Sequence, residues 1–206
     1  MIGSVQLVLA SNNQGKINEI KALLTGVQVL TQSVLGIEAC PEPACTFVEN
    51  ALLKARHAAL HAQLPAIADD SGLMVDALKG APGVRSARFS GEAATDADNI
   101  QHLLTLMQAV PESQRMARFI CVMVYVEHAE DPCPLIAQGV WEGSMTTQAR
   151  GVQGFGYDPI FWVPAQHCTA AELAPDIKNT LSHRAQALHH LSALIMAKPA
   201  RLTCPA

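Results

Sequence analysis

The stretch Ala66-Ile-Ala-Asp-Asp-Ser-Gly-Leu73 decides how the rest of this sequence is interpreted. Its short apolar run predicts a strand that delivers two adjacent carboxylates, Asp69 and Asp70, into a Ser-Gly turn. Neighbouring residues of an extended chain point to opposite faces, and an unpaired buried charge is very costly, so both carboxylates need partners. A cation such as Mg2+, which takes oxygen ligands from one or two carboxylates, would supply one. A turn in which one aspartate caps the next segment explains the residues equally well.

The N-terminus contributes a second polar segment that follows a strand. Val5–Ala10 predicts the first strand, Ser11–Lys16 the loop after it, and the apolar spacing from Ile17 to Leu24 a helix. Free N–H groups at such a helix start attract anions, and Lys16 adds a positive charge. The loop does not fit the Walker A pattern, because that pattern has an earlier glycine and a hydroxyl residue after the lysine. A plain strand-to-helix connection is therefore the alternative interpretation.

A capping box, Thr46-Phe-Val-Glu49, marks the start of another helix. An alanine-rich apolar stripe follows it, and Asn50, Lys54, His57 and His61 share the other side of this predicted helix. Lys54 is either a solvated lysine or a second cation for a polyanion. Nothing local in the sequence decides between these two roles.

Two segments nearer the C-terminus carry aromatic and cationic side chains. Gly151–Pro159 combines three glycines with Phe155 and Tyr157, which are candidates for stacking on a planar ring; core-facing aromatics in a hairpin turn are the alternative. Ser182-His-Arg184 predicts a helix start with a serine cap and two potential cations in the first turn, and Lys178 lies just upstream. Cations are disfavoured there by the helix dipole, so their presence suggests hydrogen bonds donated to a ligand.

Six segments together resemble the inosine triphosphate pyrophosphatase family, whose members hydrolyse non-standard purine nucleoside triphosphates. The resemblance covers nearly the whole chain and keeps the family's order. The matching segments are Leu7–Lys16, Thr46–Ala55, Ala68–Leu73, Gly80–Gly91, Gly154–Phe161 and Ser182–Arg184. The resemblance implies an elongated α/β fold of two lobes with a central nucleotide-binding cleft, usually assembled as a homodimer.

The resemblance also implies a role for the matched polar residues. The triphosphate would be held by Lys54 and by the N-terminal loop, whose residues are Ser11, Asn12, Asn13, Gln14, Gly15 and Lys16. Asp70 would be the catalytic residue that positions or deprotonates the attacking water, and it would bind Mg2+ together with Glu42. Ser71 would be a further substrate contact. The purine would meet Phe155, Gly156, Tyr157 and Asp158, and it would be recognised by Lys178, His183 and Arg184.

The implied reaction converts a nucleoside triphosphate and water into the monophosphate and pyrophosphate, with attack at the α-phosphorus. Such chemistry asks the protein mainly for positioning and charge neutralisation, which lysines and Mg2+ supply. A keto group at purine position 6 accepts hydrogen bonds from Arg184 or the backbone, so ITP, dITP and XTP should fit and ATP should not. Two alternatives are a nucleotide sensor without chemistry and a purely structural protein. Intact Asp69, Asp70, Lys16 and Lys54 count against the first, and the six ordered matches count against the second.

Global properties agree with a compact enzyme. With 206 residues, half of them apolar, we expect one two-lobed domain over residues 1–206 and a loose tail at 198–206. The net charge of −4 argues against a nucleic-acid-binding surface, so a phosphate site has to be a local basic pocket. The sequence contains neither a signal-like apolar region nor a long apolar span, which predicts a cytoplasmic protein without membrane contact.

Cysteine and histidine spacing predicts no zinc site. The six cysteines lack C-x-x-C spacing and are expected to be reduced thiols, with Cys121 in the core. The histidines other than His183 lack ligand spacing with cysteine and are expected to be solvated helix or loop residues.

The order of predicted elements indicates an α/β fold with a mixed sheet flanked by helices. Strands are expected up to Ala10, near Val27–Thr31 and before Asp69, and helices up to about Leu24 and from Thr46 onward. A helix at Asn99–Met107 and an antiparallel pair formed by Phe119–Val126 and Leu135–Gly143 complete the prediction.

Overall fold

A computed structural model describes residues 6–24 and 27–198 of the chain. Its centre is one seven-stranded sheet with the strand order β2-β1-β3-β4-β5-β6-β7. The strands are β1 (Gln6–Leu9), β2 (Gln28–Thr31), β3 (Ala66–Val75), β4 (Met116–Val126), β5 (Leu135–Met145), β6 (Phe161–Val163) and β7 (Cys168–Thr169). β1 pairs in parallel with β2 and β3, whereas every pair from β3 to β7 is antiparallel. The predicted mixed sheet is confirmed.

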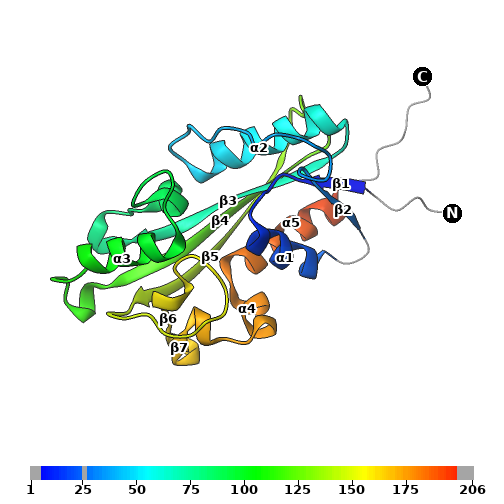
Figure 1. Cartoon of the computed structure of the whole chain (residues 1–206). Coiled ribbons are helices and arrows are strands. Elements are labelled where there is room, and N and C mark those ends of the chain that lie inside the picture. The colour runs from blue at the N-terminus through cyan, green and yellow to red at the C-terminus, as the bar shows by residue number, and fades with distance from the viewer. Residues whose placement is uncertain (1–5, 25–26, 199–206) are drawn as a thin grey trace, which may run out of the picture.

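Helices cover both faces of this sheet (Figure 1). The α-helices are α1 (Gln14–Leu23), α2 (Phe47–Ala62), α3 (Asp96–Leu106), α4 (Pro175–Leu181) and α5 (His183–Ala197). Short 3-10 helices connect them: η1 (Asp76–Leu78), η2 (Gly83–Arg88), η3 (Glu112–Gln114), η4 (Asp158–Ile160), η5 (Pro164–Gln166) and η6 (Ala170–Glu172). α2 lies on one face, and α1 and α5 lie on the other.

The side chains of β3 alternate between two separate cores, as a strand requires. Ala66 and Ala68 pack under the alanine stripe of α2. Ile67 packs on the other face with residues of α1 and α5, including Ile20 and Leu188. The small side chains of the α2 stripe let this helix approach the sheet closely, so the strand is buried on both faces.

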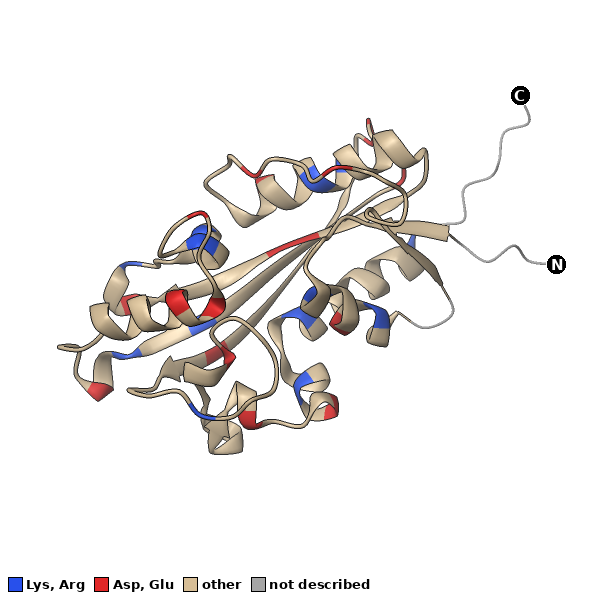
Figure 2. Ribbon diagram, viewed as in Figure 1, with Lys and Arg blue, Asp and Glu red and all other residues tan. Residues whose placement is uncertain are grey.

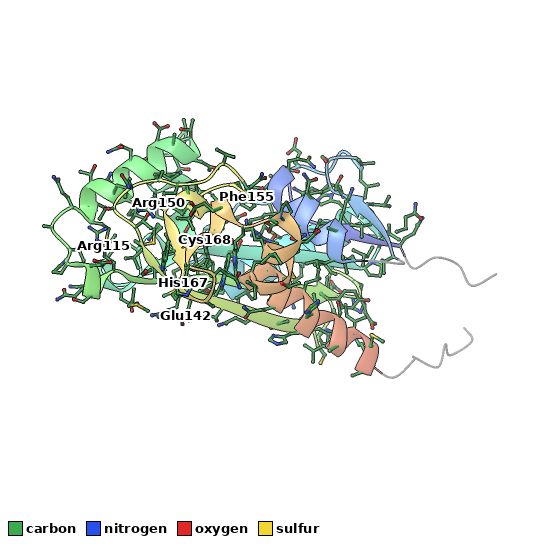
Figure 3. The ribbon with its side chains drawn as sticks, turned by 90° about the horizontal axis from the view of Figure 1, so that it is seen from below. Arg115, Glu142, Arg150, Phe155, His167 and Cys168 are labelled. Carbon is green, nitrogen blue, oxygen red and sulfur yellow. The ribbon has the colours of Figure 1, made fainter. Side chains whose placement is uncertain are left out.

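A third core fills the opposite end of the elongated sheet. Leu103 of α3 packs there with Trp141 of β5 and Phe161 of β6. Arg115, labelled in Figure 3, is buried beside this core and donates hydrogen bonds to the carbonyl groups of Val110, Thr146 and Met107. The two ends of the sheet thus form two lobes, one with two hydrophobic cores and the other with the third.

Several predicted boundaries move by a few residues. α1 begins at Gln14, earlier than predicted, because Asn13 caps it by accepting a hydrogen bond from the Lys16 N–H at 3.0 Å. α3 begins at Asp96 because Thr95 forms a capping box with Asp98.

The capping box predicted at Thr46-Phe-Val-Glu49 forms only in part. The Thr46 hydroxyl accepts a hydrogen bond from the Glu49 N–H, as predicted, but it also donates one to the Glu49 carboxylate. The predicted loose tail lies, apart from Lys198, outside the described residues. Lys198 forms an ion pair with Glu127 at 2.7 Å.

Gly139 lets the N-terminus of α5 lie directly against β5, and this contact gives a prediction. A Cβ atom at residue 139 would lie 2.0 Å from the His183 carbonyl oxygen and 2.6 Å from the Ala187 nitrogen. Overpacking costs about 1–3 kcal/mol, so Gly139→Ala should lower the melting temperature by about 2–10 °C. Gln138→Ala, which shortens an exposed side chain on the same strand, is the matched control in thermal denaturation. Equal melting temperatures for both variants would contradict the close packing of α5.

Candidate active site

Asp69 and Asp70 lie in the middle of a continuous strand, so the predicted Ser-Gly turn is wrong. β3 runs through both residues, which pair with Met123 and Val122 of β4. Gly72 does not form a turn but allows η2 to lie close to β3, because a Cβ atom at residue 72 would lie 2.3 Å from the Gly83 carbonyl oxygen. The expectation that the two carboxylates point to opposite faces is confirmed.

Asp69 is an anchor for cations from two helices. Its Oδ2 atom lies 2.9 Å from Lys16 Nζ of α1 and 3.7 Å from Arg184 Nε of α5, and the Ser71 hydroxyl donates to it at 3.1 Å. Burial alone would raise the pKa of Asp69. The charges of Lys16 and Arg184 outweigh burial and hold this pKa well below its usual range, so the carboxylate stays ionised.

Asp70 faces α2 and has a different environment. Asn50 Nδ2 donates to Asp70 Oδ2 at 3.2 Å, the Ser71 N–H donates to Oδ1 at 3.0 Å, and Lys54 Nζ lies 3.6 Å from Oδ1. Burial raises the pKa of Asp70 despite the opposing charge of Lys54. A carboxylate with raised proton affinity, facing a cavity, is suited to accept a proton from water.

Lys54 is held by carboxylates and is not a solvated lysine. Its ammonium lies 2.9 Å from Glu42 Oε1, and its side chain is 11% exposed. Burial would lower the pKa of Lys54, but Asp70, Asp69 and Glu42 together raise it. Lys54 therefore stands as a permanent positive charge between Glu42 and Asp70.

The N-terminal loop supplies one wall of the site, although not every predicted residue faces it. Ser11, Asn12, Asn13 and Lys16 line the cavity. The side chain of Gln14 donates to Asn18 on the exposed side of α1. Gly15 lies under the ring of Phe155, where a Cβ atom would come within 2.6 Å of that ring.

Phe155 belongs to the loop before β6, and its ring lies against Gly15 of α1 (Figure 3). Lys178 Nζ and Arg184 Cζ lie 5.1 and 5.5 Å from the centre of its ring, within the range of cation–π attraction. Carboxylates fix the surrounding loop, because Asp158 accepts from the Phe155 N–H and Asp96 accepts from the Gly156 N–H.

Tyr157 takes the core-facing role that was the alternative to ring stacking. Its side chain is buried in the core that contains Leu103 of α3, and its hydroxyl donates to the Ser86 carbonyl at 2.9 Å. Tyr157 is nevertheless part of the cavity lining. Burial, and to a smaller extent the charge of Asp96, raises the pKa of Tyr157 well above its usual value, so the phenol stays neutral.

Two cations of α4 and α5 are tied together by Glu19, which the sequence analysis did not assign. Lys178 Nζ lies 2.6 Å from Asp158 and 2.9 Å from Glu19, and Arg184 also pairs with Glu19. Arg184 Nη2 donates to the Ser71 hydroxyl at 3.0 Å. Glu19 follows Lys16 by about one helical turn, and an acid at that spacing is the only local signal for its position that the sequence offered.

His183 is a buried, neutral imidazole beside these cations. Its ring stacks on Phe119 with centroids 4.8 Å apart and planes inclined by 11°. Burial, reinforced by the charges of Arg184 and Lys178, lowers the pKa of His183 well below its usual value. Its Nδ1 atom is buried without a hydrogen-bond partner among the described residues.

Most of these residues line one cavity of about 710 Å³, within the size range of small-molecule sites, whereas Gln14, Gly15, Glu19 and Asp69 are not part of its lining. It opens where β1 ends and β3 continues, since the last β1–β3 pair is Leu9 with Ile67. After Ile67, β1 no longer pairs with this edge of β3. Asp70 and Ser71, which face opposite sides of the strand, therefore both reach the cavity. Figure 2 shows basic residues of α1, α2 and α4 around the acidic middle of β3.

Glu42 and Asp70 are the residues that could hold a divalent cation. They present oxygen donors on either side of Lys54. Over the described ranges, no cluster of three or more His, Cys, Asp or Glu side chains forms a metal site. Two carboxylates completed by phosphate oxygens and water suit Mg2+, which rarely uses an all-protein cage. The donor set therefore fits this cofactor.

Other sequence expectations concern thiols and membranes. Cys40, Cys45, Cys133 and Cys168 are free thiols, and Cys121 is buried in the core as predicted, whereas Cys204 lies outside the described residues. Among the helices described, none combines the length and apolar character needed to cross a membrane.

Comparison with known proteins identifies relatives over almost the full length of the chain. A family model described as the Ham1 family matches residues 7–194. The dITP/XTP pyrophosphatase of Escherichia coli (strain K12) is 55% identical over 185 residues, which are 89% of this chain and 94% of that protein. The dITP/XTP pyrophosphatase of Vibrio parahaemolyticus is 52% identical over 198 residues, covering 95% of this chain and 99% of that one.

Solved structures agree with these matches. A HAM1 protein from Coxiella burnetii superimposes with a TM-score of 0.87 at 48% identity, covering 93% of this chain and 98% of that one. The Staphylococcus aureus Ham1 protein gives a TM-score of 0.83 at 38% identity, covering 94% and 99%. The motifs, the mixed sheet and the matched relatives agree, and the chain belongs to the Ham1 family.

Proposed function

We propose that this protein hydrolyses non-standard purine nucleoside triphosphates, namely ITP, dITP and XTP, to the monophosphate and pyrophosphate. The observation that carries the proposal is the meeting of two kinds of groups in one cavity. Asp70, Lys16 and Lys54 form a charged end, and Phe155 with Lys178 forms an aromatic and cationic end. Relatives named dITP/XTP pyrophosphatase support the same reaction and disfavour a sensor without chemistry.

The charged end supplies the chemistry of this proposal. Asp70 accepts a proton from the attacking water or orients it, and its raised proton affinity favours this role. Lys16 and Lys54 neutralise the triphosphate as the leaving pyrophosphate gains charge. Glu42 and Asp70 would hold Mg2+, which when bound polarises the phosphate oxygens. Ser11, Asn12 and Asn13, at the start of α1, contribute polar groups beside the phosphates.

The other end of the cavity recognises the purine. Phe155 provides the stacking surface, and Lys178, His183 and Arg184 provide polar groups beside it. Arg184 has five N–H donors, and its contacts with Glu19 and Ser71 leave donors for a 6-keto oxygen. The 6-amino group of adenine donates hydrogen bonds and would meet these donors unfavourably, so ATP is disfavoured.

The family likeness also supports a homodimer that acts on the free nucleotide pool of the cytoplasm. The net charge of −4 agrees with small nucleotides, and not nucleic acid, as partners.

The first prediction tests the reaction itself with a panel of nucleotides and Mg2+. Pyrophosphate release should be fast with ITP, dITP and XTP, slow with ATP, and absent in EDTA. Asp70→Asn keeps the shape of the side chain but cannot accept the proton, so kcat should fall about 10²-fold or more with the fold intact. Near wild-type kcat in Asp70→Asn, or activity that persists in chelator, would overturn the assignment.

The second prediction tests the phosphate-binding role of Lys54. Removing a cation aimed at developing negative charge costs about 10²-fold, so Lys54→Ala should reduce kcat/KM for ITP by about this factor. Lys21→Ala is the matched control, because Lys21 is an exposed lysine on α1 that lies outside the cavity. Equal kcat/KM values for the two variants in steady-state kinetics would show that Lys54 has a purely structural role.

The third prediction concerns the base and uses Arg184→Lys, which keeps the positive charge beside Asp69 and Glu19. Arg184→Ala would leave two buried carboxylates short of a partner and would destabilise the fold. Loss of the guanidinium hydrogen bond should reduce kcat/KM for ITP by about tenfold or more and leave ATP hydrolysis nearly unchanged. The measurement is the ITP-to-ATP ratio at fixed Mg2+ and pH. An equal loss for both nucleotides would show that Arg184 does not contact the base.

A further inference from the structure

Asn50 of α2 is a buried amide that contacts Asp70 and the backbone of the loop that carries Glu42. Its side chain has no exposed surface. Its Nδ2 atom donates to Asp70 Oδ2 at 3.2 Å and to the Ala44 carbonyl at 3.3 Å, and its Oδ1 atom accepts from the Ala44 N–H at 3.0 Å. The amide therefore links Asp70 of β3 to the loop that precedes α2.

The position of Asn50 is unusual for the helix that carries it. The other buried residues of α2 are alanines: Ala51, Ala55, Ala58 and Ala59. Asparagine is a poorer helix former than alanine, and a buried amide is costly unless it is hydrogen-bonded. A polar residue whose burial is shared only with alanines of its helix, and whose amide is used at both ends, indicates a task other than filling space.

The loop that Asn50 holds carries Glu42. Residues 37–44 have no regular secondary structure, so few backbone hydrogen bonds fix their path. Asn50 pairs with both the N–H and the C=O of Ala44, two residues after Glu42. A second tether is the Arg88 Nη2 atom, which donates to the Glu42 carbonyl at 3.4 Å.

Asp70 is fixed by the same amide. Asn50 donates a hydrogen bond to its Oδ2 atom, and the Ser71 N–H donates one to its Oδ1 atom. The two hydrogen bonds fix the orientation of the carboxylate plane. One side chain thus restrains the two acidic groups that flank Lys54.

We propose that Asn50 is a positioning residue that sets the separation of Glu42 and Asp70, so that both can bind one divalent cation together with the substrate phosphates. This inference rests on the proposed function of the same cavity. Asn50 itself contacts neither substrate nor metal and acts through Asp70 and the Ala44 backbone. Partners that orient metal-binding residues in this way typically contribute about 10- to 100-fold to metal affinity or activity.

The test compares Asn50→Leu and Asn50→Ala with Thr46→Ala. Leucine has the same branched shape as asparagine and fills the site, although it is somewhat larger, and it cannot hydrogen-bond; alanine cannot hydrogen-bond either and also leaves space. Thr46→Ala removes the N-cap of the same helix without touching Asp70, so it reports the effect of destabilising α2 alone. Circular dichroism and melting temperature establish that each variant is folded, and Asn50→Ala remains available if Asn50→Leu does not fold.

Two readouts separate positioning from packing. In steady-state assays with ITP, both Asn50 variants should lose about tenfold or more in kcat and require more Mg2+ for half-maximal rate, with KM for ITP within about threefold. In the nucleotide-free protein, the dissociation constant for Mn2+, measured by electron paramagnetic resonance, should rise about tenfold. Thr46→Ala should keep all of these values within about twofold.

Two outcomes would overturn the proposal. Wild-type kcat and Mn2+ affinity in Asn50→Leu, with losses only in Asn50→Ala, would show that Asn50 merely fills space. Values in both Asn50 variants equal to those of Thr46→Ala would show a general effect of helix stability. The Mn2+ measurement needs no turnover, so it tests the role of Asn50 independently of the reaction. If the wild-type protein released no pyrophosphate, that result would refute the proposed function and not the role of Asn50.

Discussion

The burial of two adjacent carboxylates in one strand is the constraint on which the rest of the structure depends. Because successive residues of β3 face opposite sides of the sheet, Asp69 and Asp70 cannot share one partner. Each needs its own compensation, since an isolated buried charge is far too costly to keep. Lys16 of α1 and Arg184 of α5 supply it on one face, and α2 supplies it on the other. Three helices are thereby tied to the middle of the strand.

This arrangement gives two chemically identical side chains different properties. Asp69 is surrounded by cations, and its pKa is lowered, so it remains a fixed charge that holds α1 and α5 in place. Asp70 has an amide, a backbone N–H and a more distant ammonium, and burial raises its pKa. The anchor and the reactive group are neighbours in sequence, and the pleat of the strand separates their environments.

Carboxylates also organise the cationic end of the cavity in a chain whose net charge is negative. Glu19 joins Lys178 to Arg184, and Asp158 holds Lys178 together with the N–H of Phe155. The cations therefore keep fixed positions without a ligand, which reduces the entropy that binding must overcome. A local basic pocket is compatible with an acidic protein because Lys178 and Arg184 are each paired with a carboxylate.

The sequence by itself determined the order of the elements, the mixed sheet, the Ser182 cap of α5 and the motifs of the family, because these depend on local periodicity, caps and spacing. It did not reveal that Gly72 belongs to a strand, that Tyr157 faces the core, or that Glu19 and Asn50 hold the site together. Those properties depend on contacts between residues far apart in the chain. Only the tertiary structure, which ends β1 beside the start of β3, decided that both faces of the strand open into one cavity.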